Sequence, residues 1–255
     1  MKKHIKRMIL IMIIMIAAYF GVKFFLNKEQ PIEREFYVVE ESHYYLKDSI
    51  SDDTQGSMLY FTNDEDFHLV VPGMMVFIYN EEKTMRFMVD DVYEKDVHGE
   101  YKDGQLFYGR RVYFTLPHTN LTYTMDKMYI EFSTLFDGTY IFNAGSLHVE
   151  FKEELPFYKY RSLEGTKKEL EPTLDEILVG IWDKGEIDHI YVGPYEAPYY
   201  IKDNIIHIVM PEEIHMLSQT FVLFEVEGKT FHISNFKYFW NYEILTFGIY
   251  TKYEI

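Results

Sequence analysis

The sequence Glu100-Tyr101-Lys102-Asp103-Gly104-Gln105-Leu106-Phe107 gives the clearest indication of how this chain folds. An Asp-Gly pair between two short runs of strand-forming residues is the typical signal of a two-residue β-hairpin, because both turn positions need a positive φ. We therefore predict two antiparallel strands that are joined at Asp103 and Gly104.

Alternating apolar and polar residues extend this pattern on both sides of the hairpin. Every second residue is apolar in three further runs: Met85–Val89, Leu121–Met125 and Leu147–Phe151. Such alternation is typical of a sheet with one face on a core and the other in water. Asp137-Gly138 and Ala144-Gly145 add turn signals. Short strands separated by turns roughly every 8–12 residues predict an antiparallel β-sandwich over residues 36–152.

Residues 153–172 interrupt the strand pattern. They contain Pro156, Gly165 and Pro172 together with a charged run. This composition is typical of a linker between domains. We therefore predict a boundary here, followed by a smaller β-rich α+β domain at residues 173–255.

The segment that follows the linker has the pattern of a helix. Thr173 and Glu176 have the spacing of a capping box, and Gly185 supplies a stop. The apolar residues between them recur at helical spacing: Leu174, Ile177, Leu178, Ile181 and Trp182. A buried strand is the alternative, because Ile177–Trp182 is also a continuous apolar run that contains a glycine.

Strand patterns resume in the rest of this part. Four runs are predicted as strands: Ile187–Val192, Ile205–Met210, Phe221–Val226 and Thr230–Ser234. The last two are joined through Glu227-Gly228. Pro211-Glu212-Glu213 has the composition of one helical turn, with proline at its first position and acidic residues near its positive end. The alternative to a separate α+β domain is a continuation of the sandwich.

Residues 8–26 form an apolar stretch about as long as a helix needs to cross a bilayer core. Its single charge, Lys23, is close enough to one end for the side chain to reach the headgroups. Basic residues mark the cytoplasmic side of a membrane segment, and four precede this one: Lys2, Lys3, Lys6 and Arg7. We therefore predict a cytoplasmic tip and transmembrane anchor at residues 1–28 and a polar stalk at residues 29–35. The protein would span the cell membrane once, with its C-terminal domains outside.

Cleavage of this segment as a signal peptide is the main alternative to an anchor. Ile16-Ala17-Ala18 offers an imperfect cleavage site, but the apolar Tyr19–Leu26 follows it where a polar stretch is expected. A helix buried in a domain core is the third alternative, although such helices rarely follow a basic cluster so directly. The chain has no cysteine, so anchoring by a lipid on cysteine is excluded.

Charge and cysteine content limit the partners and the source of the protein. Six of the 25 Lys and Arg residues lie in residues 1–28, so residues 29–255 carry 19 basic against 41 acidic side chains, a net charge of −22. A domain this acidic repels phosphate backbones, and we exclude nucleic acid as a partner. The absence of cysteine is unusual for a small secreted eukaryotic domain. We expect a bacterial protein of the cell envelope.

The sequence contains no recognisable catalytic motif. It lacks a nucleophile elbow, a His-Glu-x-x-His zinc helix, a phosphate loop and a dinucleotide-binding glycine motif. Three pairs could contribute to a metal site if a third ligand came from elsewhere: His148 with Glu150, Asp188 with His189, and Glu213 with His215. Solvent-facing polar residues explain these pairs equally well, so we assign no catalytic, cofactor-binding or metal residue.

The acidic run Asp64, Glu65 and Asp66 is the candidate for a bound calcium ion. Calcium prefers several oxygen ligands from loops of this kind. However, the run lacks the alternating acidic positions and the following glycine of an EF-hand-type loop. An acidic surface that keeps the domain soluble and protects sheet edges is the simpler interpretation.

Aromatic residues are abundant, with 23 Tyr, 21 Phe and 2 Trp. Most are expected in the core, because aromatics are common in strands. One segment holds more aromatics than a single strand can bury, and we predict it as the interaction surface: Phe236, Tyr238, Phe239, Trp240 and Tyr242.

These features predict a general type of function but do not indicate a specific reaction. We expect a non-catalytic interaction or sensory accessory domain of the cell envelope, anchored in the lipid bilayer through residues 8–26 and bound to another envelope protein. A module that binds cell-wall glycans is one alternative, since exposed aromatic rings suit sugar faces. An envelope hydrolase that uses two carboxylates is the other.

Overall fold

The computed structural model describes residues 34–47, 54–117, 119–134, 138–167, 173–182, 186–214, 216–238 and 243–255. The predicted anchor at residues 8–26 lies outside these residues, as do its charged neighbours Lys2, Lys3, Lys6, Arg7 and Lys23. Within the described ranges, no helix has the length and apolar character needed to cross a membrane. The chain separates into residues 1–34 and 35–255, and every sheet belongs to the second unit.

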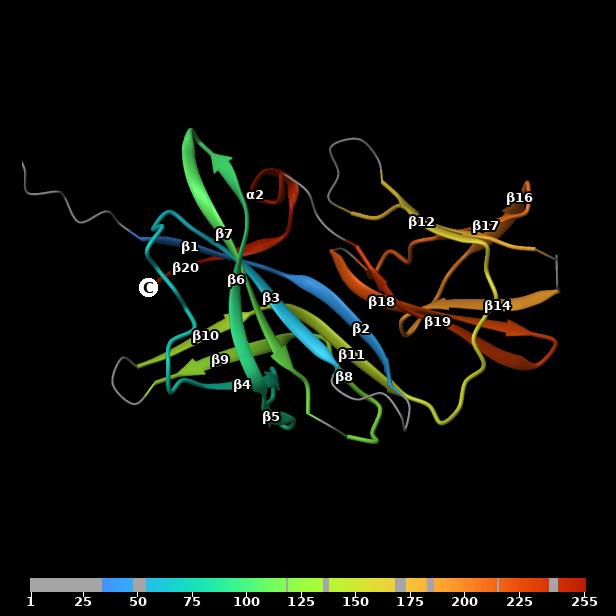
Figure 1. Ribbon diagram of the computed structural model, residues 1–255, viewed down its shortest axis with the longest axis horizontal. Helices are drawn as coiled ribbons and strands as arrows, with labels where there is room; N and C mark the ends of the chain where they lie inside the picture. The colour runs from blue at the N-terminus through green and yellow to red at the C-terminus, as the bar shows by residue number, and fades with distance from the viewer. Residues whose placement is uncertain are drawn as a thin grey trace, which may run out of the picture. The chain divides into compact units, whose positions relative to one another are not determined.

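The described residues are mainly strands, which form several sheets (Figure 1), as predicted for a β-sandwich. The first sheet has the order β20 (Tyr250–Glu254), β1 (Glu35–Val39), β3 (Gln55–Thr62), β7 (Gln105–Thr115) and β6 (Asp90–Lys102). The second has the order β10 (Thr139–Asn143), β9 (Met128–Ser133), β4 (Met75–Asn80) and β5 (Arg86–Met88).

Two further sheets contain the remaining strands. The third has the order β15 (Tyr195–Glu196), β14 (Ile187–Val192), β18 (Leu217–Val226), β2 (Glu41–Lys47), β11 (Gly145–Phe151) and β8 (Tyr123–Met125), and β19 (Lys229–Lys237) also pairs with β18. The fourth has the order β12 (Ser162–Thr166), β13 (Glu176–Gly180), β17 (Ile205–Val209) and β16 (Tyr199–Lys202). The short helix α2 (Ile244–Phe247) precedes β20.

The predicted two-residue hairpin at Asp103-Gly104 and the predicted connection through Glu227-Gly228 are both confirmed. Asp103 and Gly104 join β6 to β7 with φ values of 51° and 80°. Glu227 and Gly228 join β18 to β19 with φ values of 50° and 72°. Positive φ at both central positions is the geometry that matches the right-handed twist of the flanking strands.

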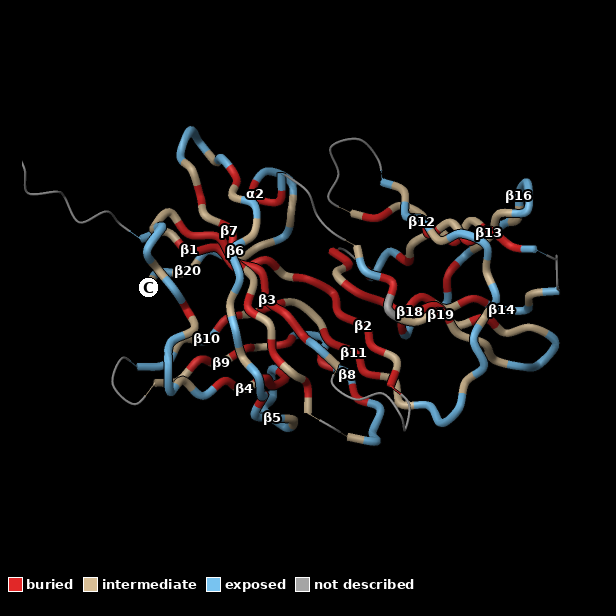
Figure 2. The backbone as a smooth tube through the Cα atoms, in the orientation of Figure 1, coloured by how far each residue is buried: buried red, intermediate tan, exposed pale blue. Residues whose placement is uncertain are grey.

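Alternating burial along the strands builds the cores, which Figure 2 shows as red stretches along β2 and β3. On β7, Val112 and Phe114 are almost completely buried, whereas Arg111 and Tyr113 face the other side of the sheet. One large apolar cluster comes mainly from residues 36–149 and a second mainly from residues 174–236. A smaller third cluster includes Ile244 and Leu245 of α2.

Strands from the two sides of the predicted linker share sheets. The strand β2 lies between β11 and β18 and is parallel to both, which differs from the purely antiparallel sandwich we predicted. At the other end of the chain, β20 is antiparallel to β1. The strand β12 lies within the predicted linker. The division into domains at residues 36–152, 153–172 and 173–255 stays a prediction.

The predicted helix after the linker is wrong, and the alternative strand is correct. Residues Glu176–Gly180 form β13, which pairs with β12 and β17. Ile177 and Val179 are fully buried on one face, so burial follows a period of two. A side chain at Gly180 would collide with Ser162 of β12, which explains the glycine within the apolar run. The predicted turn after Pro211 is present, since the Ile214 amide donates to its carbonyl oxygen at 3.0 Å.

Candidate ligand-binding site

A pocket of about 460 Å³ lies against one face of β3, β6 and β7. The strand register places its wall residues on the same side of this sheet. Lys95 on β6 is directly opposite Arg111 on β7, and Tyr93 is opposite Tyr113. Ser57 on β3 is opposite Tyr113 from the other side. Because alternate residues share a face, these side chains all point away from the large core beneath the sheet.

The facing wall comes from β2 and from the hairpin β18–β19. His43 and Tyr45 line the pocket from β2, and Gln219 and Lys237 line it from β18 and β19. The register pairs Gln219 with both His43 and Lys237, which brings the three strands together at this point. Residues that are far apart in the sequence therefore form one pocket.

A buried ion pair joins the two walls. Glu41 is 1% exposed and accepts two hydrogen bonds from Arg111, at 2.8 Å from Nη1 to Oε2 and at 3.0 Å from Nη2 to Oε1. Arg111 Nη1 also donates to Ser57 Oγ at 3.0 Å. Burial disfavours the charged guanidinium, but Glu41 outweighs this effect and raises the pKa of Arg111. The pair connects β2 to β7 by a two-pronged contact, the strongest geometry for these groups.

His43 is the second buried polar group of this site. It is 1% exposed, and among the described residues neither of its ring nitrogens has a hydrogen-bond partner. Its Nε2 lies 3.9 Å from Glu41 Oε2, and its ring is parallel to that of Tyr45. Burial lowers the pKa of His43 to about 4, so the imidazole is neutral at pH 7. An unpaired buried imidazole costs about 1–3 kcal/mol of stability.

The rim of the pocket combines aromatic rings with positive charge. The rings of Tyr93 and Tyr113 are stacked with centroids 5.1 Å apart. The ammonium group of Lys95 lies 5.1 Å from the centroid of the first ring and 5.6 Å from that of the second. Gln55 Nε2 donates to the Tyr93 hydroxyl at 2.7 Å. These contacts hold a cation at the entrance, and no carboxylate of the described residues pairs with it.

Glu100 closes one end of the pocket and holds α2 in place. Its carboxylate oxygens accept hydrogen bonds from the backbone amides of Ile244 at 3.0 Å and Leu245 at 2.8 Å. Glu100 is 7% exposed, so these bonds satisfy an otherwise buried charge.

The predicted interaction surface is only partly described. Phe236 is buried at 8% exposure, and Tyr238 is half-buried and lines the pocket. Both side chains pack with the second apolar cluster. Phe239, Trp240 and Tyr242 lie outside the described residues, so the prediction for this segment as a whole stays a prediction.

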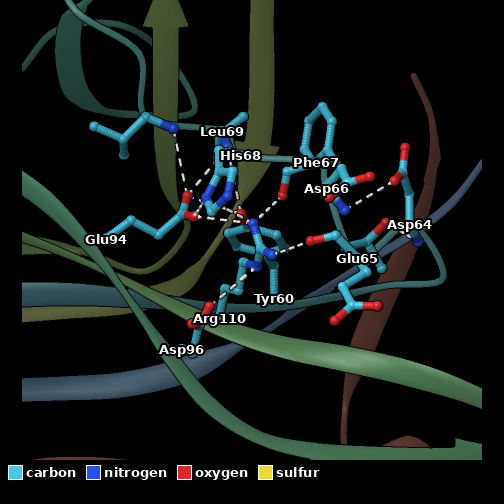
Figure 3. A network of polar contacts seen from close by, with 12 residues as sticks. Tyr60, Asp64, Glu65, Asp66, Phe67, His68, Leu69, Glu94, Asp96 and Arg110 are labelled. Carbon is cyan, nitrogen blue, oxygen red and sulfur yellow. Dashed lines mark hydrogen bonds and ion pairs between the residues drawn. The ribbon is translucent and has the colours of Figure 1, made fainter.

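The acidic loop predicted as a calcium candidate is organised around an arginine (Figure 3). The Arg110 guanidinium donates to the carbonyl oxygens of Glu65 and Phe67, and Asp64 Oδ1 accepts from the Asp66 amide at 3.1 Å. A protein cation thus occupies two backbone carbonyl oxygens of this loop. Within the described ranges, no three His, Asp or Glu side chains are grouped closely enough to hold a metal ion.

Glu94 completes this arginine network beneath the loop. Its Oε2 accepts from the Tyr60 hydroxyl at 2.8 Å and from the Leu69 amide at 3.1 Å, while His68 Nδ1 lies 2.8 Å from Oε1 (Figure 3). Arg110 Nη1 is 3.4 Å from the same Oε1. The cluster fixes the loop to β6 and β7.

The structure places the three histidine–carboxylate pairs predicted from the sequence in different surroundings. His148 Nε2 lies 3.3 Å from Glu150 Oε2, but His148 is buried because both faces of β11 are covered. His189 contacts Glu196 at 2.8 Å, a partner that the sequence did not indicate. His215 lies outside the described residues.

Sequence reasoning missed the pocket because its walls come from strands about 70 residues apart. The sequence did contain one signal: charged side chains occur within segments that otherwise have the apolar pattern of buried strands. Glu41 and His43 precede the apolar Tyr44 and Tyr45, and Arg111 lies within the apolar run of β7. Charged residues are almost never buried unless paired, so each indicates a partner elsewhere.

Comparisons with known proteins do not identify the chain. No protein-family model matches it, and no curated protein matches it. Among solved structures, the chain is similar to one described as a marsupial T cell receptor, with 7% sequence identity over 78% of this chain and 93% of that one. The TM-score of 0.20 is too low for this likeness to support any argument about fold or function.

Proposed function

We propose that residues 35–255 form a non-catalytic sensory domain that binds a small polar ligand in the pocket between β7 and β2. The observation that carries this proposal is that Arg111, which lines the pocket, is held by the buried Glu41 behind it, next to His43, whose ring nitrogens have no hydrogen-bond partner among the described residues. Well-packed apolar residues in place of a buried ion pair are often neutral or stabilising. A buried ion pair that apolar residues could replace without loss of folding stability is typical of a functional site, where binding and not stability determines the residues.

Binding is favoured over hydrolysis by the state of the two carboxylates at the pocket. A glycoside hydrolase needs one carboxyl group as an acid and another as a base or nucleophile. Here Glu41 is held by Arg111, and Glu100 accepts two backbone amides. Both groups are engaged as structural acceptors, which suits a binding site.

The location of this domain is part of the proposal. An anchor at residues 8–26 with cytoplasmic Lys2, Lys3, Lys6 and Arg7 would hold the domain outside the membrane of a bacterial cell, where another envelope protein would receive the signal. The support comes from the apolar length and the flanking charges alone. Protease treatment of intact cells should remove the C-terminal domain and leave the N-terminal tip protected.

Thermal unfolding of the full-length protein in the presence of small molecules tests the pocket. The panel contains neutral sugars, sugar acids, amino acids and nucleotides. A compound present at 100 times its Kd stabilises the fold by about 2.7 kcal/mol, a shift of several degrees in Tm. The Ser218→Trp variant fills the pocket and should abolish the shift, whereas Ser133→Trp on β9 should retain it. If no compound shifts Tm, or if Ser218→Trp responds like the natural protein, the proposal is wrong.

A further inference from the structure

The guanidinium of Arg111 has hydrogen-bonding capacity that the protein does not use. Arginine presents five N–H groups arranged as two forks. Glu41 occupies the fork formed by Nη1 and Nη2, and Ser57 takes the second N–H of Nη1. Among the described residues, the fork formed by Nε and Nη2 has no partner. Since Arg111 lines the pocket, this fork is available to a ligand there.

Further positive charge lies on the same pocket wall. Lys95 is the cross-strand neighbour of Arg111, and like charges in this position repel each other. Lys237 lines the facing wall. Within the described residues, neither lysine forms an ion pair with a carboxylate. In a domain with a net charge of −22, this arrangement marks a local binding site for an anion.

The charge balance of the pocket indicates an anion with a single charge. Three cations, Arg111, Lys95 and Lys237, stand against two carboxylates, Glu41 and Glu100, which leaves one net positive charge. A planar carboxylate matches both this charge and the free arginine fork. A phosphate dianion exceeds the available charge and is repelled by the adjacent Glu41.

The other residues that line the pocket indicate the chemical nature of the rest of the ligand, beyond its carboxylate. Eight of the 18 residues that line the pocket carry a hydroxyl or an amide group, among them Tyr45, Ser57, Tyr93, Tyr113, Gln219 and Tyr238. Such groups pair with ligand hydroxyls, and a volume of about 460 Å³ accommodates a single sugar ring with substituents.

Resting on the proposed binding function, we propose that the pocket binds a hydroxylated monocarboxylate, a sugar acid, whose carboxylate is held by the Nε–Nη2 fork of Arg111 with Lys95 beside it. The sugar hydroxyls contact the tyrosine, serine and glutamine side chains. Arg111 thus holds two carboxylates at once, that of Glu41 and that of the ligand.

Isothermal titration calorimetry of the full-length protein tests this inference. The probes are D-glucuronate, D-gluconate and N-acetylmuramate, and D-glucose and inorganic phosphate serve for comparison. At least one sugar acid should bind about tenfold tighter than glucose and phosphate, because a charge-assisted two-pronged contact is worth at least 1.4 kcal/mol.

Variants then locate the carboxylate. Arg111→Lys keeps the charge beside Glu41 but cannot form the free fork, and it should weaken sugar-acid binding about tenfold. Lys95→Met changes an exposed side chain, so it should fold normally and weaken binding severalfold. Lys127→Met, which removes an exposed lysine paired with Glu81, should change nothing.

The outcomes separate this inference from the proposed function. Equal affinity for glucose and the sugar acids, or sugar-acid affinity unchanged in both Arg111→Lys and Lys95→Met, overturns the carboxylate inference. No sugar-acid binding up to about 10 mM also overturns it. A neutral compound whose thermal shift is lost in Ser218→Trp would keep the pocket as a binding site while rejecting the sugar acid.

Discussion

Acidification should destabilise this protein through His43. Its pKa is about 4 in the folded protein because of burial, against 6.5 for an exposed histidine. The unfolded chain therefore takes up the proton first as the pH falls. The stability contributed by the neutral imidazole is fully present above pH 6.5 and is lost progressively between pH 6.5 and pH 4. At pH 5 the loss amounts to about 2 kcal/mol.

Urea unfolding of the full-length protein at pH 7.5 and pH 5.0 measures this loss, with tyrosine and tryptophan fluorescence as the signal. The natural protein should lose about 2 kcal/mol more between the two pH values than His43→Phe, which cannot take up a proton. Carboxylates such as Glu35, whose pKa is lowered by Lys252, also contribute to acid sensitivity. Their contribution is common to both proteins and cancels in the comparison.

His189 provides the matched control. It is exposed, and its hydrogen bond to Glu196 raises its pKa. A raised pKa stabilises the fold below pH 6.5, so His189→Gln should not reduce the acid loss. If His43→Phe loses as much stability as the natural protein, then His43 is not held neutral by burial and the reasoning fails.

Further substitutions test the contacts of β2, of Arg111 and of the loop held by Arg110. Gly145 has a φ of 100°, and a Cβ there would collide with the backbone of Glu41. Gly145→Ala should therefore lower the free energy of unfolding in urea by more than about 4 kcal/mol. The control Gly104→Ala, at a φ of 80° with open space around it, should lower it by about 1 kcal/mol. Arg111→Met should cost about 3–5 kcal/mol by leaving Glu41 unpaired, and the double variant with Glu41→Met should recover most of this loss. Arg110→Ala removes the donor that holds the loop after β3, so limited proteolysis should cut that loop faster than in the natural protein.

Local signals predicted the local structure well. The Asp103-Gly104 turn and the strand Ile187–Val192 were both evident from the sequence, since turn residues and alternation act over a few positions. The segment Glu176–Gly180 was misassigned because its apolar spacing fits a helix and a buried strand alike. Only its partners β12 and β17 decide between them. Tertiary context overrode a weak capping signal.

The pocket required information that no local pattern contains. Glu41 on β2 and Arg111 on β7 belong to different sheets, and they meet only because the two sheets pack together. The alternation along each strand says only that Glu41 shares a face with His43 and that Arg111 shares one with Tyr113. The charges themselves were visible, but a buried charge identifies its partner only once the sheets are assembled. The contact of Arg110 with the acidic loop was equally hidden, because Arg110 approaches that loop from a distant strand.

The position of the pocket suits the proposed sensory role. One wall belongs to the sheet of β3, β6 and β7, and the other to β2 and the β18–β19 hairpin, which carries the second apolar cluster. A ligand that contacts Arg111 and Gln219 together stabilises only conformations in which both walls are in place. By linkage, its binding free energy is then added to the stability of that arrangement, as RT ln(1 + [L]/Kd). Ligand occupancy and the packing of β2 between its two neighbouring strands are therefore coupled. A substitution that loosens this packing without touching the pocket should weaken ligand binding only to the extent that it lowers the fraction of molecules in which both walls are in place.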